Sequence, residues 1–210
     1  MKPIALSMTT FGDFVVADSP GQLAKLREIR RQYEQPYFPG GDFWSRWRED
    51  VERLHIDGGS RRDLAPIAER AKDNRGPQYS KASRGYATFW GNKAIELAGH
   101  PKPATWKHDR LSVRVNPEWI LRIGGKVRVV KLHLKERLVL SQRLANPLLF
   151  LLDEHFGPAV GGPPVGILDV QRGRLWTRRT QRRDVEAVLR MQAAALIAGW
   201  DELDQQRGVA

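Results

Sequence analysis

The chain contains no cysteine, which excludes structural disulfides and thiolate metal sites. A cysteine-free chain is compatible with a reducing compartment, and we expect a cytoplasmic protein. No apolar run approaches the roughly 18 residues that a membrane-spanning helix needs, so no membrane span is expected. The opening stretch, MKPIALSMTTFGDF, has one lysine and too short an apolar core for a secretory signal. Without disulfides, the fold must be stabilised by its core. Any catalysis or metal binding must use oxygen and nitrogen groups.

Several common functional motifs are also missing. The sequence has no G-x-S-x-G, no P-loop and no dinucleotide-binding glycine motif. Its histidines show no metal-ligand spacing, and we interpret them as structural or surface residues. They are His55, His100, His108, His133 and His155.

Positive charge is in excess. The 210 residues include 35 Lys and Arg against 24 Asp and Glu, a formal net charge of +11. Such a balance favours polyanions, namely nucleic acid, an acidic membrane surface or an acidic protein partner. The alternative is an ordinary protein from an arginine-rich proteome. Residues 106–140 alone hold nine basic and three acidic side chains, so the excess is concentrated where strands are predicted.

The first half of the chain has the patterns of helices separated by Gly/Pro linkers. We expect residues 1–15 to be irregular, and apolar periodicity with capping residues predicts helices after them. The predicted helices cover about residues 19–34, 42–54, 60–76 and 81–97. The aromatic group that includes Phe43, Trp44 and Trp47 is interpreted as helix packing. The composition changes at Gly99-His100-Pro101, which divides the chain into a helical region, 1–98, and an α/β core, 99–210. We expect the two to pack as one compact unit.

The clearest strand pattern lies in residues 111–135. Apolar residues alternate from Leu111 to Val115, Pro117 interrupts the ladder, and Trp119–Ile123 resumes it. Gly124-Gly125 is typical of a two-residue hairpin turn, and the partner strand follows. A helix at 141–156, a buried strand at 166–170 and a helix at 183–204 complete the prediction. The fold class is therefore α+β, with a small mixed sheet in a strand-strand-helix-strand-helix core.

The partner strand of the hairpin changes character along its length. Val129, Lys131 and His133 share one face, which turns from apolar to cationic. The strand either passes from a buried region to an exposed rim or contains a bulge near Val130. Lys131 is then either a solvent-facing lysine or a cation in an anion-binding groove.

This hairpin, NPEWILRIGGKVRVVKLHLK, and the later strand ILDV resemble the core of the PD-(D/E)xK nuclease superfamily over about residues 105–180. The resemblance implies a catalytic set of Glu118, Asp169 and Lys131, with the two carboxylates holding Mg²⁺ and the lysine acting on the attacking water. Lys131 matches the family lysine. The position two before it is Val129 where the family has an acid, which favours a degenerate, non-catalytic member.

A dense arginine segment follows the later strand. Arginine contacts phosphates bidentately and tryptophan can stack on a base. The segment therefore predicts a nucleic-acid interface, together with the hairpin cations; the alternative is a solvated loop and helix entry. The residues are Arg172, Arg174, Trp176, Arg178, Arg179, Arg182 and Arg183, with Lys126 and Arg128 on the hairpin.

The leading hypothesis is a nucleic-acid-binding protein, and the resemblance implies that it is a degenerate module of the nuclease fold. DNA and RNA are not distinguished. One alternative is a Mg²⁺-dependent nuclease using Glu118, Asp169 and Lys131. The other is a protein-interaction module whose basic surface binds an acidic protein partner.

Overall fold

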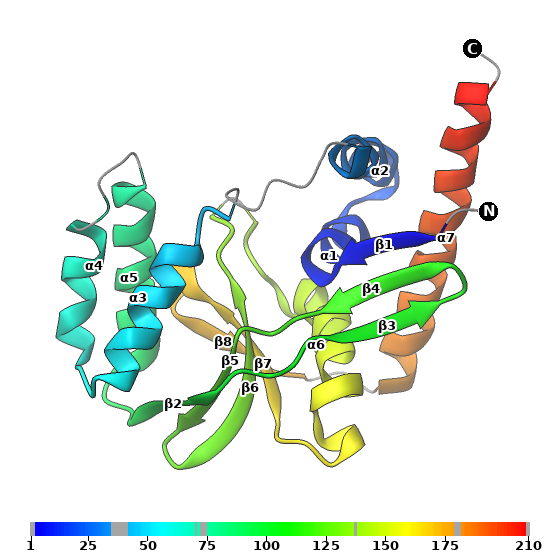
Figure 1. Ribbon diagram of the computed structural model, residues 1–210. Helices are drawn as coiled ribbons and strands as arrows, with labels where there is room; N and C mark the ends of the chain where they lie inside the picture. Colours follow the sequence, from blue (N-terminus) through cyan, green and yellow to red (C-terminus); the bar gives the residue numbers. More distant parts are fainter. Residues whose placement is uncertain are drawn as a thin grey trace.

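The fold is α+β, as the sequence predicts. The computed structural model describes residues 3–34, 42–69, 71, 75–136, 138–178 and 182–208. A five-stranded sheet stands between a layer of three helices and a second layer made of helices and a smaller sheet (Figure 1). None of the described helices is long and apolar enough to cross a membrane.

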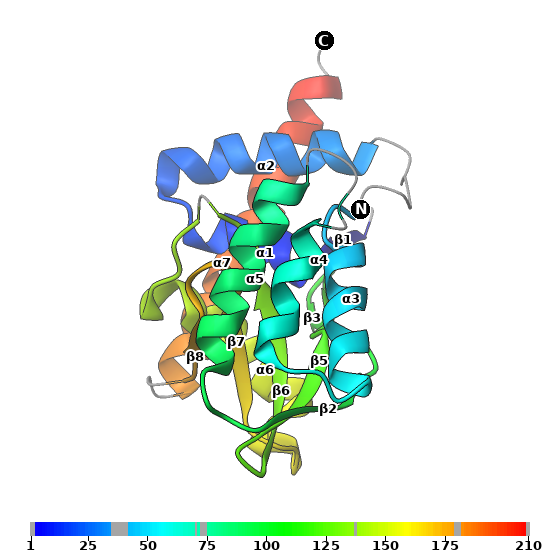
Figure 2. The same cartoon turned by 90° about the vertical axis from the view of Figure 1, so that its left-hand side faces the viewer.

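The helices fall into two groups about the five-stranded sheet. Figure 2 shows α3, α4 and α5 side by side over one face, and α6 covers the other. The α-helices are α1 (Met8–Val16), α2 (Ser19–Glu34), α3 (Ser45–Ile56), α4 (Ala65–Glu69), α5 (Gly76–Trp90), α6 (Gln142–Phe156) and α7 (Arg182–Gly208). Short 3₁₀ turns are η2 (Arg61–Leu64), η3 (Pro158–Val160) and η4 (Val170–Arg172).

The strands form two mixed sheets. The larger has the order β2-β5-β6-β7-β8, in which β6 and β7 are parallel, joined by α6, and the other pairs are antiparallel. The smaller has the order β1-β4-β3, with β1 parallel to β4. The strands are β1 (Ile4–Ser7), β2 (Ile95–Gly99), β3 (Ala104–His108), β4 (Leu111–Val115), β5 (Trp119–Ile123), β6 (Lys126–His133), β7 (Val165–Asp169) and β8 (Arg174–Trp176).

Residues 4–16 form a strand and a helix, and the prediction of an irregular arm was wrong. Ser7 caps α1, since its hydroxyl accepts a hydrogen bond from the Thr10 amide at 3.0 Å. Met8, Phe11 and Phe14 then recur at helical spacing and are buried. The prediction failed because both elements are short and β1 is stabilised by distant segments: it pairs with β4, and Ile4 and Leu6 are buried in the core.

The predicted helix at 81–97 was also wrong at its end. α5 ends at Trp90, and Gly91 follows with a φ of 53°. The chain then enters β2, which pairs with β5. β1 and β2 both pair with strands beyond residue 99. Each sheet therefore contains residues from both sides of the boundary predicted at residue 98.

The long first strand predicted for the hairpin is two strands in different sheets. β4 pairs with β3 in the small sheet, and β5 pairs with β6 in the large one. The change of sheet occurs at Asn116-Pro117-Glu118, where Pro117 has no amide hydrogen to continue a ladder. The segment 116–118 therefore links the two sheets.

β6 contains no bulge, because its register with β5 and with β7 runs without a shift. Val130 and Leu132 pack under α3–α5, whereas Val129 packs on the α6 side. Lys131 and His133 share the face of Val129 and lie beyond the apolar part of that core. They are only 7% and 8% exposed, so Lys131 is not a solvent-facing lysine.

Candidate functional site

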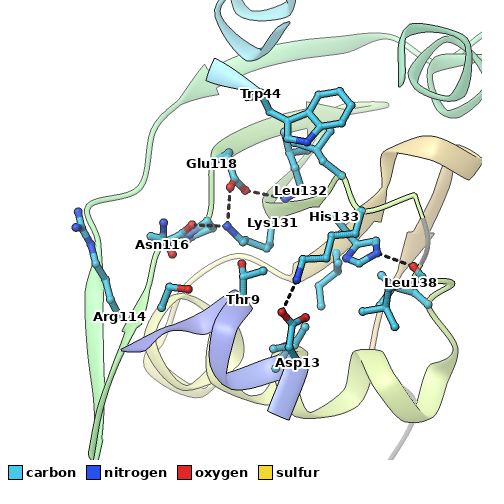
Figure 3. Close-up of a pocket in the computed structure, with 18 of the residues that line it drawn as sticks. Thr9, Asp13, Trp44, Arg114, Asn116, Glu118, Lys131, Leu132, His133 and Leu138 are labelled. Carbon is cyan, nitrogen blue, oxygen red and sulfur yellow. Dashed lines mark hydrogen bonds and ion pairs between the residues drawn. The ribbon is translucent and has the colours of Figure 1, made fainter. Parts of the chain in front are cut away.

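A cleft of about 600 Å³ opens where the two sheets meet; we call it the central cleft. Figure 3 shows the labelled side chains around it. Its walls come from α1, the start of α3, the 114–118 segment, β6 and α6. The polar lining residues include Asp13, Asp42, Arg48, His100, Arg114, Asn116, Glu118, Lys131, His133 and Lys135.

Glu118 and Lys131 meet in the cleft. The Lys131 ammonium donates to Glu118 Oε1 at 2.6 Å and to the Asn116 carbonyl at 3.1 Å. The second carboxylate oxygen, Oε2, accepts from the Leu132 amide at 2.7 Å. The two side chains are 16% and 9% exposed, so the pair is mostly removed from water. Both charges are nevertheless satisfied, as buried ions require.

The other two carboxylates of the cleft are also paired with cations. Asp13 on α1 accepts from Lys135, which follows β6. Asp42 accepts from Arg48 at 2.6 Å, and this hydrogen bond lowers the pKa of Asp42. Arg114 differs from these cations, because it is exposed and forms no ion pair with any residue that the structure describes.

His133 is buried beside the Glu118–Lys131 pair on β6. Its Nε2 lies 2.8 Å from the Leu138 carbonyl, which can only accept, so Nε2 carries the hydrogen. Burial lowers the pKa of His133, against smaller opposing effects of that hydrogen bond and of Asp169. The imidazole is therefore neutral at pH 7 and supplies no positive charge to the cleft.

Asp169 does not join Glu118. Asp169 is aligned with His133, while Glu118 lies opposite Lys131 across the β5–β6 pair. Glu118 and Asp169 are separated by two strand spacings across the sheet, which is about 10 Å. Along the strands they are offset by two residues, which is about 7 Å. Asp169 is 1% exposed and pairs instead with Arg172 at 3.3 Å. Of the three residues predicted as catalytic, the structure brings together only Glu118 and Lys131.

The residues present do not form a Mg²⁺ site. Magnesium requires open oxygen ligands in near-octahedral geometry. Both oxygens of Glu118 are engaged within the protein, and Asp169 is bound to Arg172. Within the described part of the chain no group of three or more histidine, aspartate or glutamate side chains is placed to hold a metal ion.

The predicted arginine interface is largely engaged in contacts within the chain. Arg178 pairs with Asp153 at 3.2 Å, and Arg172 with Asp169. The Arg174 guanidinium lies 3.8 Å from the centre of the Trp176 ring.

Trp176 itself is only 8% exposed, so it has no free face for a base. Arg183 is exposed at the start of α7. Arg179 and the side chain of Arg182 lie outside the described residues.

The two hairpin cations differ in surroundings. Lys126 is exposed beside the Gly124-Gly125 turn. Arg128 donates to the Val165 carbonyl at 2.9 Å, and burial lowers its pKa. Arg128 therefore stabilises the pairing of β6 with the start of β7. Neither Lys126 nor Arg128 lines the central cleft.

The sequence prediction missed most of the cleft. Asp13, Trp44, Arg114 and Lys135 are far apart in the chain and carry no recognisable spacing. The one available indication was the alternation of β4, which places Arg114 opposite to the buried Val113 and Val115. That this exposed face of β4 lines the cleft depends on the change of sheet after residue 115, which the alternation does not predict.

Comparison with known proteins adds no relative to this description: no family model, no curated protein and no solved structure matches the chain.

Proposed function

We propose that this protein binds nucleic acid and that the central cleft is the binding site. The observation that carries the proposal is Arg114, an exposed guanidinium on the cleft wall with no ion pair among the described residues. A guanidinium that is not neutralised within the protein is available for a phosphate.

The charge of the rest of the cleft supports the same reading. Each of its carboxylates is bound by a cation, so none presents an open negative charge to a phosphate. Arg114 and the net charge of +11 then set the attraction for a polyanion.

We also propose that the protein is a degenerate, non-catalytic member of the nuclease fold. The support for this relation is the element order β5, β6, α6 and β7, which is the order on which the resemblance rests. The engaged oxygens of Glu118 and the separate position of Asp169 favour binding over metal-dependent cleavage.

The test compares charge reversals at the two candidate interfaces. Binding of a fluorescein-labelled DNA or RNA strand of about 16 nucleotides is followed by anisotropy. We expect Arg114→Glu to weaken binding by about tenfold or more, and Arg183→Glu, a matched exposed arginine away from the cleft, to change it by less than about twofold.

The salt dependence of binding is an independent test of the proposed contact between Arg114 and a phosphate. For a single strand, loss of one phosphate contact lowers the slope of log K against log salt concentration by about 0.7. Arg114→Ala should show that decrease. A salt-insensitive interaction, or equal effects of the two charge reversals, would contradict binding in the cleft.

A further inference from the structure

We propose that the strand held in the central cleft is single-stranded and that one of its bases stacks on Trp44. This inference rests on the proposed function and specifies its ligand. Trp44 lies at the entrance to α3 and lines the cleft over the Glu118–Lys131 pair (Figure 3). It is half-buried and is one of the residues that line the cleft.

The Trp44 ring is supported on its other sides. Tyr79 stacks on it with ring centres 5.6 Å apart and planes at 25°. Phe43 and Trp47 meet it edge to face at 5.0 and 6.3 Å. A ring held in this way is already ordered, so stacking a base on it costs little conformational entropy.

The backbone beneath Trp44 is fixed as well. The Trp44 amide donates to Asp42 Oδ1 at 3.0 Å, and Asp42 also holds Arg48. The Tyr79 hydroxyl donates to the Phe43 carbonyl at 2.7 Å, which ties α5 to this segment. The position of the ring is therefore set by two helices rather than by a free loop.

The remaining cleft lining suits bases better than a duplex backbone. Much of it is apolar and comes from α6, the 138–140 segment and three prolines. A duplex turns its phosphates outward and keeps its base faces stacked inside, whereas an unpaired strand offers both base faces and phosphates. The apolar lining residues include Pro101, Pro103, Pro117, Leu138, Leu140, Leu144 and Leu148.

Arg114 completes the arrangement. It lies on β4 at one side of the cleft, and Trp44 lies at another side, above Glu118 and Leu132 (Figure 3). A single strand passing between them would place a base against the tryptophan and a phosphate near the guanidinium. The volume of about 600 Å³ falls in the range of pockets that enclose small molecules, so unpaired nucleotides fit where a duplex does not.

The experiment measures binding of three probes by the full chain. They are a thymidine oligomer of about 16 nucleotides, a duplex of the same length and thymidine monophosphate. We expect the oligomer to bind at least about tenfold more tightly than the duplex, and the mononucleotide to bind weakly, because it offers only one stacking and one phosphate contact.

Variants then locate the stacking contact. Trp44→Ala should weaken binding of the oligomer by about tenfold or more, and Trp44→Phe by less than about threefold. Trp200→Ala is the matched control, because Trp200 is a half-buried tryptophan on α7, outside the cleft lining and under Arg30. Its loss should leave affinity unchanged.

An abasic strand of the same length keeps the inference testable if Trp44→Ala does not fold. The wild-type protein should bind this base-free strand about tenfold more weakly than the thymidine oligomer. Equal binding of the abasic strand, equal binding of the duplex, or saturation by the mononucleotide alone would overturn the inference. If binding still depends on Arg114 in those cases, the proposed function survives; if no probe binds, both fail.

Discussion

The Glu118 carboxylate holds the Lys131 ammonium at 2.6 Å across the β5–β6 pair, inside the central cleft. The segment that carries Glu118 is also the one that leads the chain from the small sheet to the large one. The ion pair therefore sits at the junction on which the shape of the cleft depends.

Breaking this pair should destabilise the fold. We expect Glu118→Ala to reduce the free energy of unfolding by about 3–5 kcal/mol, because it leaves the Lys131 ammonium buried without its counter-charge. The double variant Glu118→Ala with Lys131→Met should recover part of the loss, because it also removes the ammonium that Glu118→Ala leaves unpaired. Urea unfolding of the single and double variants measures the coupling. Additive losses would show that the two side chains act independently.

Magnesium should not stabilise the protein. Both Glu118 oxygens are already engaged, so Mg²⁺ would have to displace Lys131 or the Leu132 amide before it could bind. We expect the melting temperature to stay constant as Mg²⁺ is added and after treatment with a chelator. A rise that follows Mg²⁺ concentration and disappears in Glu118→Gln would instead support the nuclease alternative.

Gly85 on α5 should not tolerate a side chain. A Cβ there would lie 1.9 Å from the Val170 carbonyl oxygen, where η4 packs against the helix. Alanine favours a helix over glycine by about 1 kcal/mol, but the clash should outweigh this and give a net loss of about 1–3 kcal/mol. Gly76→Ala is the control, since its nearest atom would lie at 3.6 Å. Equal melting temperatures for the two variants would contradict the close approach.

The effect of a substitution in the β5–β6 turn on stability should depend only on how well the new residue tolerates a positive φ. Gly124 and Gly125 have φ values of 55° and 81°, and no neighbouring atom lies within 4 Å of a Cβ built on Gly124. Gly124→Asn should be nearly neutral, whereas Gly124→Val should cost about 1–3 kcal/mol, because a β-branched residue is strained at positive φ. Denaturant unfolding compares the two, and similar midpoints would exclude strain as the cause.

Stability should fall as the solution becomes mildly acidic. Burial lowers the pKa of both His55 and His133, so the unfolded chain binds more protons than the folded protein just below the ordinary histidine value of 6.5. The free energy of unfolding should therefore be highest above about pH 6.5 and decrease as pH falls toward the folded pKa values.

His55→Phe tests this dependence directly. The phenyl ring can keep the stacking on Trp90, whose ring centre lies 4.5 Å from that of His55, although the bond to the Tyr86 hydroxyl is lost. We expect a lower overall stability but a smaller slope between about pH 7 and about pH 5.5. An unchanged slope would show that His55 does not titrate with folding.

Local sequence patterns predicted the elements that depend on their own residues. The hairpin turn at Gly124-Gly125 and the helix at 142–156 were both confirmed, because glycine tolerance of positive φ and helical periodicity are readable from a few neighbouring positions. β1, β2 and β3 were missed. Each is a strand of four or five residues, and short strands are defined by the partners they pair with.

The candidate site was predicted only where two of its members lie on one hairpin. Glu118 and Lys131 were selected because of the resemblance to the nuclease superfamily. The fold brings them together because antiparallel strands joined by a tight turn place such residues face to face. Asp169 was expected beside them, but it lies one strand further on and is taken up by Arg172. The arginine segment was predicted to form a nucleic-acid interface. In the fold, Arg172 and Arg178 instead pair with the buried carboxylates of Asp169 and Asp153.

The sequence by itself determined an α+β chain with a strong positive charge, a central hairpin and no cysteine chemistry, because composition, periodicity and turn residues are local properties. Only the tertiary structure decided that the strand before Pro117 leaves for a second sheet, and that Asp13, Trp44, Arg114 and the Glu118–Lys131 pair line one cleft. These residues come together through pairing and packing between distant segments, and no local pattern encodes which distant segments will meet.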